Sequence, residues 1–143
     1  MAAEAAKESS LWAAALRPVG ARKRVAVFSP LAPAGLAFGL ETVYEAYIVH
    51  YGTSRLFDAA DEGERVLLGD YLYAHGLVRI AQTGGVDAVV VMAELISRCA
   101  SLRAAGASGD GDAWVDAMRA LGGEPAAEAV TAALRLHTET CRS

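Results

Sequence analysis

The acidic residues Glu41 and Glu45 come closest to a reactive pair in this sequence. They are four residues apart, so a helix places both on one face, where two carboxylates can hold a divalent cation or act as acid and base. The alternative is a solvated helix face, which we favour because no third ligand is identifiable. Asp70 is a separate candidate, since it interrupts an apolar segment and a buried carboxylate must find donors. We expect Asp70 to form structural hydrogen bonds to a neighbouring helix.

Three tyrosines, Tyr44, Tyr47 and Tyr51, follow the spacing i, i+3 and i+7. In a helix this spacing places their rings along one face, and such a wall of aromatic rings is typical of a protein core. With His50 beside them, the rings could instead line an elongated apolar pocket with a polar mouth. The sequence leaves both interpretations open.

Other catalytic patterns are missing. The histidines His50, His75 and His137 fall in separate predicted helices without the Glu-x-x-His spacing of di-iron bundles, which favours ordinary packed or surface histidines. Cys99 and Cys141 have neither metal-ligand spacing nor a recognisable nucleophile context. No glycine-rich phosphate loop follows a strand. We therefore expect no catalytic residues, no metal site and no cofactor.

Length and composition favour a single helical domain over residues 1–143, since 143 residues that are 54% hydrophobic suffice for one core. The formal net charge of −4 argues against nucleic acid as a partner. Two widely spaced cysteines indicate reduced thiols and a cytoplasmic protein. The longest uncharged run, residues 25–40, is too short to span a bilayer and contains prolines, so we expect no integral membrane segment and no targeting segment.

The elements that must position these residues follow a helical period, and we expect an all-α bundle of about six helices. The first, over 2–16, is a loosely docked helix within residues 1–20. Three further helices are expected over 29–51, 61–82 and 86–105. A flexible connector over 106–111 leads to a short helix capped by Asp112, and a last helix begins at about 125. The helix over 61–82 is apolar on most sides, which predicts a central position. Gly69 and Gly76 are one heptad apart, a spacing that lets a neighbouring helix approach closely.

The helix over 86–105 is expected to bury one stripe of side chains, formed by Val89, Ala93, Ile96 and Ala100.

Two segments together resemble the trans-isoprenyl diphosphate synthases, or polyprenyl synthetases. Residues 41–50, ETVYEAYIVH, are similar to the family's helix E-L-x-H-x-A-S-L-x-H, which ends in its first aspartate-rich motif. Residues 68–74, LGDYLYA, are similar to the family's L-A-G-D-Y-L-L-A helix, which includes Asp70 and comes next in the same order. The resemblance covers roughly residues 29–105 and implies part of the isoprenoid synthase fold.

The resemblance breaks at the metal-binding residues. Where the family has paired aspartates directly after the histidine, this chain has Tyr51 and Gly52, which cannot hold the magnesium ions of a prenyl diphosphate. The second aspartate-rich motif has no match, and the chain is about half the usual length. In the family, the positions that match Ala46 and Tyr47 line the hydrophobic tunnel that limits product length. The resemblance thus implies ligand-binding positions without catalysis.

From this resemblance we expect a non-catalytic accessory or regulatory subunit, which forms a homo-oligomer or a heterodimer with a full-length prenyl synthase. One alternative is a stand-alone carrier of a prenyl or other long apolar ligand, bound beside Tyr44, Tyr47 and Tyr51. Another is a cryptic prenyltransferase that uses Glu41, Glu45 and Asp70.

Overall fold

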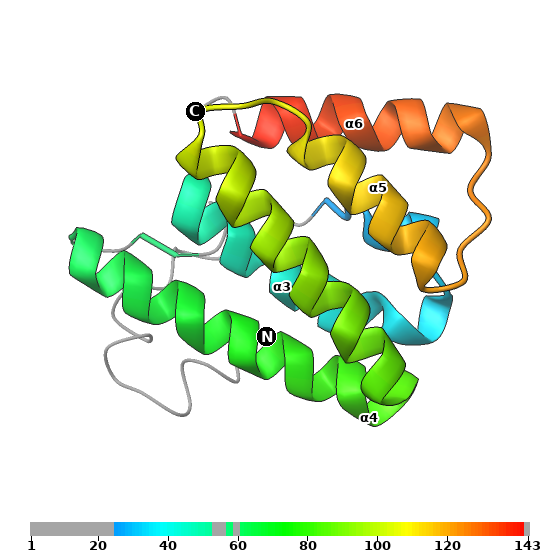
Figure 1. The fold of residues 1–143 in the computed structure, drawn as a ribbon, viewed down its shortest axis with the longest axis horizontal. Helices are drawn as coiled ribbons and strands as arrows, with labels where there is room; N and C mark the ends of the chain where they lie inside the picture. Colours follow the sequence, from blue (N-terminus) through cyan, green and yellow to red (C-terminus); the bar gives the residue numbers. More distant parts are fainter. Residues whose placement is uncertain (1–24, 53–56, 59–60, 142–143) are drawn as a thin grey trace.

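The described residues of the computed structural model, 25–52, 57–58 and 61–141, form an all-helical unit. It contains four α-helices, α3 (Ala37–Tyr51), α4 (Glu62–Ala104), α5 (Asp110–Ala120) and α6 (Ala127–Cys141), and two short 3-10 turns, η2 (Ser29–Leu31) and η3 (Ala34–Leu36). The all-α prediction is confirmed, whereas the expected number of about six helices is not. The predicted helix over 2–16 lies outside the described residues. Figure 1 shows α3 behind α4, with α5 and α6 in the upper part of the view.

The helix expected to begin near Ser29 begins later, at Ala37. Two prolines account for the delay, because Pro30 and Pro33 lack the amide hydrogen that a continuous helix needs in its interior, and Pro33 has extended backbone angles. The 3-10 turns η2 and η3 therefore precede α3. At the other end, the helix stops at Tyr51, and the Gly52 N–H donates to the Ile48 carbonyl at 2.8 Å.

α3 is the buried centre of the fold. Ten of its 15 residues are buried, whereas the side chains of Val66, Leu67 and Val78 on α4 are about half exposed. The prediction that the helix over 61–82 would be central is therefore wrong. Periodicity shows that several faces are apolar, but it does not show on how many sides a helix has neighbours. Here α4 has its buried side chains on one side.

α4 consists of two helical segments joined by a break at Gly85, whose backbone angles (φ 72°, ψ −168°) are not helical. The left-handed φ is open to glycine without the penalty that a Cβ brings. Asp61 caps the first segment, since its Oδ1 accepts the Glu64 N–H at 2.8 Å, as the capping-box spacing predicts. Figure 1 shows the second segment running back along the first. The predicted stop at Gly84 and Gly85 is thus confirmed.

Close packing of α3 against the first segment of α4 depends on glycine. A Cβ added at Gly76 would lie 2.6 Å from Val43 Cγ2 and 3.1 Å from the Gly39 carbonyl oxygen, and one at Gly69 would collide with the His50 ring. The predicted close approach along Gly69 and Gly76 is therefore present. It brings the segment with Asp70 against the end of α3.

Replacing Gly76 by alanine is expected to destabilise the fold by about 1–2 kcal/mol, because overpacking costs more than the helix propensity that alanine adds. Urea unfolding measures the difference. Gly63→Ala is the matched control on the same helix, since a Cβ there meets only Asp61 Oδ1 at 3.4 Å. A Gly76→Ala protein as stable as the wild type would contradict the tight helix crossing.

The second segment of α4 buries Ala88, Met92, Leu95 and Cys99. The predicted stripe was Val89, Ala93, Ile96 and Ala100, so the prediction is wrong by one position. The observed stripe carries two long, flexible side chains, Met92 and Leu95, which fill more of the space against the core than the alanines of the predicted stripe.

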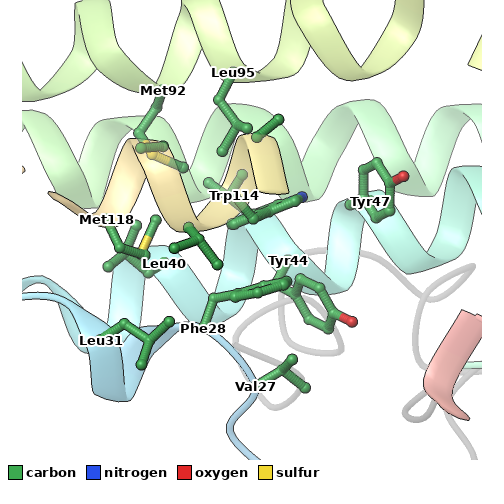
Figure 2. Close-up of a cluster of buried hydrophobic side chains, with 14 of the residues drawn as sticks. Val27, Phe28, Leu31, Leu40, Tyr44, Tyr47, Met92, Leu95, Trp114 and Met118 are labelled. Atoms are coloured by element: carbon green, nitrogen blue, oxygen red, sulfur yellow. The ribbon is translucent and has the colours of Figure 1, made fainter. Parts of the chain in front are cut away.

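The main core lies between α3, α4 and α5. Phe28 stacks on Trp114 with ring centroids 5.4 Å apart, and Tyr44 meets Trp114 edge-on at 5.2 Å. Figure 2 shows these rings side by side, with Leu40 and Met118 next to them. The segment before α3 thus contributes Phe28 to the core, which fixes Tyr44 between two aromatic neighbours. No helix in the described ranges is long and apolar enough to cross a membrane.

Candidate functional site

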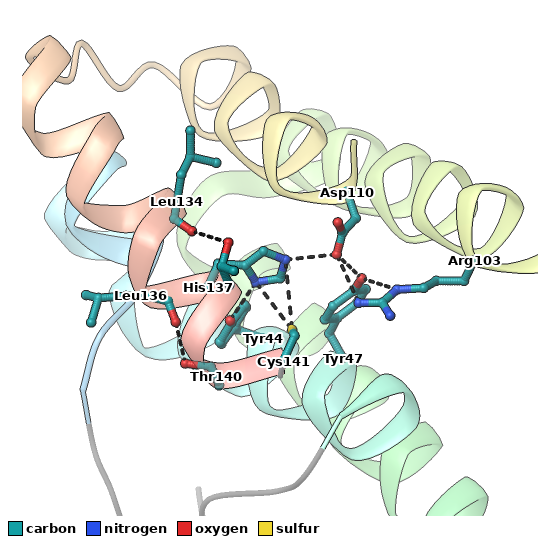
Figure 3. Close-up of polar contacts among 10 residues, drawn as sticks. Tyr44, Tyr47, Arg103, Asp110, Leu134, Leu136, His137, Thr140 and Cys141 are labelled. Carbon is teal, nitrogen blue, oxygen red and sulfur yellow. Dashed lines mark hydrogen bonds and ion pairs between the residues drawn. The ribbon is translucent and has the colours of Figure 1, made fainter. Parts of the chain in front are cut away.

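The hydroxyl ends of Tyr44 and Tyr47 leave the aromatic core and meet charged residues from three other helical segments. Tyr44 Oη lies 2.8 Å from His137 Nδ1, and His137 Nε2 lies 2.8 Å from Asp110 Oδ2. The Tyr47 hydroxyl donates to the same Asp110 oxygen. Figure 3 shows this chain of contacts between α3, α5 and α6. We call it the polar cluster, and it comprises Tyr44, Tyr47, Arg103, Asp110, His137 and Cys141.

Arg103, in the last turn of α4, closes the polar cluster on its outer side. Its Nε donates to the Tyr47 hydroxyl at 2.9 Å, and its terminal nitrogen donates to Asp110 Oδ2 at 3.1 Å. The guanidinium carbon lies over the Tyr47 and Tyr51 rings, 5.4 and 5.3 Å from their centroids. One carboxylate oxygen, Asp110 Oδ2, therefore accepts from a phenol, a guanidinium and an imidazole at once.

The contacts set the charges of the polar cluster. The hydrogen bond from His137 holds the pKa of Asp110 well below its usual range, against the opposing effect of burial. Burial lowers the pKa of His137, but its hydrogen bond to Asp110 and its contact with Cys141 outweigh burial and raise that pKa to about 9. Burial and the bond to Asp110 raise the pKa of Tyr47 far above its ordinary value. Near neutral pH, Asp110 is therefore an anion, His137 a cation and Tyr47 a neutral donor.

A pocket of about 290 Å³ opens beside the polar cluster. Arg103, Asp110, His137, Thr138 and Cys141 line it. These residues lie at the end of α4, the start of α5 and the end of α6, so three element ends meet there. With His137 protonated, the lining carries two positive charges and one negative charge. The pocket is small and open, and it brings the Cys141 thiol next to these charged side chains.

The polar cluster was largely missed by sequence reasoning. The sequence predicts Asp110 to lie in the connector over 106–111, but it is the first residue of α5, two positions before the predicted cap Asp112. Gly109, with φ 112°, takes the cap position instead. The sequence predicts His137 to be an ordinary packed or surface histidine. The spacing i, i+4 of His137 and Cys141 was the one local pattern that could have indicated their contact.

The predicted ligand-binding residues of α3 lie in different surroundings. Tyr44 and Tyr47 are 2% and 1% exposed, and their rings belong to the core. Ala46 is fully buried in a smaller cluster with Val49 and Leu68. Tyr51 is half-buried against the main core. Of the two interpretations of the three tyrosines, a protein core therefore applies to Tyr44 and Tyr47.

His50 and Asp70 form a pair at the far end of α3, with His50 Nε2 3.4 Å from Asp70 Oδ1. The side chain of Asp70 is 68% exposed, so the expectation of a buried carboxylate is wrong, while a bond to the neighbouring helix is present. The reason is the orientation of α4 about its axis. Leu68, Gly69 and Leu72 are on the buried side of this helix, and Asp70 is on another side. Burial lowers the pKa of His50 against the opposing effect of Asp70.

The glutamate pair has one buried member. Glu45 is fully buried, so the predicted solvated face is wrong for this residue, while Glu41 accepts a hydrogen bond from Ser29 Oγ at 2.5 Å. The cause is the central position of α3, which has neighbours on most sides. Within the ranges that the structure covers, no three His, Cys, Asp or Glu side chains are grouped so as to hold a metal ion. Cys99 and Cys141 are both free thiols.

A second candidate surface lies on the side of α4 that faces away from the core. We call it the outer face of α4. Its side chains are exposed and uncharged, and they recur at helical spacing on both segments. They are Leu67, Ala74, Val78, Ala81, Val86, Val90, Ala93, Ser97 and Ala104.

Comparisons of this chain with known protein families, with curated proteins and with solved structures find no match.

Proposed function

We propose that this chain is a non-catalytic, isoprenyl-synthase-like accessory subunit, and that the isolated protein pairs with a second copy through the outer face of α4. The observation that carries the proposal is this face, where Val86 is 78% exposed and Leu67 and Val78 are more than half exposed. Contiguous exposed apolar side chains are typical of surfaces that bind another protein.

The end of α3 supports the non-catalytic part of the proposal. The helix stops at Tyr51 and Gly52, the positions where the resemblance to prenyl synthases would require magnesium-binding carboxylates. A phenol and a glycine offer no hard anionic oxygen for a divalent cation. Asp70, a carboxylate on the facing helix, is paired with His50. Ionisation of an allylic diphosphate would therefore lack its electrophile.

Charge supports a second copy as the occupant of the outer face. The chain has a formal net charge of −4, so two copies repel each other at long range, and like charges within the contact surface would add to that repulsion. The nine side chains of the outer face are uncharged, and one exposed carboxylate, Asp70, lies at its edge, one helical turn from Leu67 and from Ala74. Its small residues, such as Ala74, Ala93 and Ser97, let two helices approach closely. A two-fold arrangement would bury the same face on both copies.

Sedimentation velocity over a range of concentrations tests the pairing. We expect the wild type to form a dimer, and the double variant Val78→Glu/Val90→Glu to weaken dimerisation by at least about tenfold, because each buried charge lacks a partner. Ala129→Glu/Ala132→Glu is the matched control, since it adds two charges at exposed positions of α6.

Mixing with a full-length prenyl synthase from the same genome separates the two kinds of partner. If the protein is monomeric alone but co-sediments with the synthase, the partner of the outer face is the synthase and not a second copy. A protein that is monomeric at all concentrations and indifferent to the synthase would overturn the proposal.

The two other functions have less support. A prenyl carrier needs space beside Tyr44 and Tyr47, but both rings are packed against Trp114 and their hydroxyls are bonded within the polar cluster. A cryptic prenyltransferase would need Glu45 and Asp70 at one metal, and the first is buried while the second is exposed.

A further inference from the structure

Cys141 is the one thiol of the polar cluster, and the proposed function does not use it. It is the last residue of α6 and one of the five residues that line the pocket. Its Sγ lies 3.6 Å from His137 Nδ1 and 3.9 Å from His137 Nε2, so the sulfur rests against the ring and not at the end of a single N–H bond. In Figure 3 the sulfur points toward the imidazole.

Two cationic side chains lie beside this sulfur. His137 is a cation near neutral pH, and Asp110 on the other side of the ring holds it in that form. Arg103 supplies a second positive charge and interacts electrostatically with Cys141. A neighbouring imidazolium or guanidinium stabilises the thiolate, which is the reactive form of cysteine.

Cys99 is an internal reference within the same chain. It is 1% exposed in the core, and burial raises its pKa to about 11. Such a thiol is protonated at neutral pH and closed to reagents, whereas Cys141 is half-buried at a pocket. The two thiols should therefore differ strongly in reactivity.

We propose that Cys141 is a modification site for small disulfides that carry a negative charge, with Arg103 as the group that attracts that charge. In the reaction, the Cys141 thiolate attacks one sulfur of the disulfide, the reagent's S–S bond breaks, and a mixed disulfide forms at Cys141. The other half of the reagent leaves as a thiolate, and the proton of the Cys141 thiol passes to solvent. Cys141 is oxidised, and the released half is reduced. This inference is independent of the proposed function.

Two reagents that differ in charge test the proposal, namely dithiobis-nitrobenzoate, a dianionic disulfide, and dithiodipyridine, a neutral one. With the folded wild type we expect one fast and one slow thiol for each reagent. The Cys141→Ser variant should remove the fast phase. A Cys141 that reacts no faster than the same thiol in the urea-unfolded chain would overturn the proposal.

The role of Arg103 is measured as the ratio of the rates with the anionic and the neutral reagent. In Arg103→Gln this ratio should fall by about fourfold, the factor expected for one unit charge about 5 Å away in a water-like dielectric. Arg103→Lys keeps the charge and should keep the ratio. Arg98→Gln is the matched control, because Arg98 is an exposed arginine on the same helix that pairs with Asp116.

The ratio of the two rates also distinguishes the loss of the Arg103 charge from a loss of folded structure. A variant that merely unfolds would expose Cys99 and speed the reaction with both reagents alike. An unchanged ratio in folded Arg103→Gln would overturn the assignment of Arg103, and an equal fall in Arg98→Gln would show an effect of overall charge instead.

Discussion

Trp114→Ala is expected to lower the free energy of unfolding by about 3–5 kcal/mol, the cost of deleting a large aromatic side chain from a packed core. Trp114 is 1% exposed, stacks on Phe28 and meets Tyr44 and Tyr47 edge-on. Its removal would leave a cavity between these three rings. Urea unfolding followed by circular dichroism measures the loss.

Trp114→Phe is the companion variant, and it should cost less than about 2 kcal/mol. The buried indole Nε1 of Trp114 has no hydrogen-bond partner among the described residues, so replacing the indole by a phenyl ring loses volume but none of the described hydrogen bonds. Removing an unsatisfied donor even offsets part of the loss. If Trp114→Phe were as destabilising as Trp114→Ala, the indole N–H would have to contribute a bond, and the packing account would be wrong.

The stability of the protein is expected to fall by about 2 kcal/mol between about pH 6 and about pH 8.5, because His137 holds its proton more tightly in the folded chain. Its folded pKa is about 9, above the ordinary value of 6.5. A raised histidine pKa stabilises the fold fully below the unfolded value, and this contribution is lost as the pH rises through about 9. Urea unfolding at several pH values gives the slope.

His137→Gln provides the control, since it cannot titrate and should remove most of the slope. The lowered pKa of Asp110 has the opposite sign, so its contribution is present above the ordinary value and is lost only in acid. Stability should therefore be greatest in the mildly acidic range. A wild-type protein whose stability is flat from mildly acidic to mildly alkaline pH would show that His137 is not held as a cation.

The sequence predicted the helix cap and the helix break that depend on neighbouring residues. The Asp61 cap follows from a side chain that bonds an amide three residues away, and the break at Gly85 follows from adjacent glycines. Burial was harder to predict. Leu67 and Val78 belong to the helix over 61–82, which the pattern predicts to be central, but both are more than half exposed, because periodicity reveals an apolar face without revealing whether a neighbour covers it.

The polar cluster could not be predicted because it joins residues that are far apart in the chain. Tyr44 meets His137 across 93 positions, and Tyr47 meets Asp110 across 63. Nothing in the spacing of Tyr44 and Tyr47 indicates that their hydroxyls leave the core, and nothing in a glycine-rich connector indicates that Asp110 begins a helix. Tertiary packing alone brings these side chains together. The individual helices were therefore easier to predict than the site that they build.

The reversal at Gly85 has a consequence for the order in which the chain folds. Contacts between the two segments of α4 span short stretches of sequence, so closing that hairpin loses little chain entropy. The bond between Tyr44 and His137 closes a loop of 93 positions and needs α6 to be in place. We therefore expect the hairpin in the folding nucleus, and the docking of α6, with the seating of Cys141 at its pocket, among the last steps.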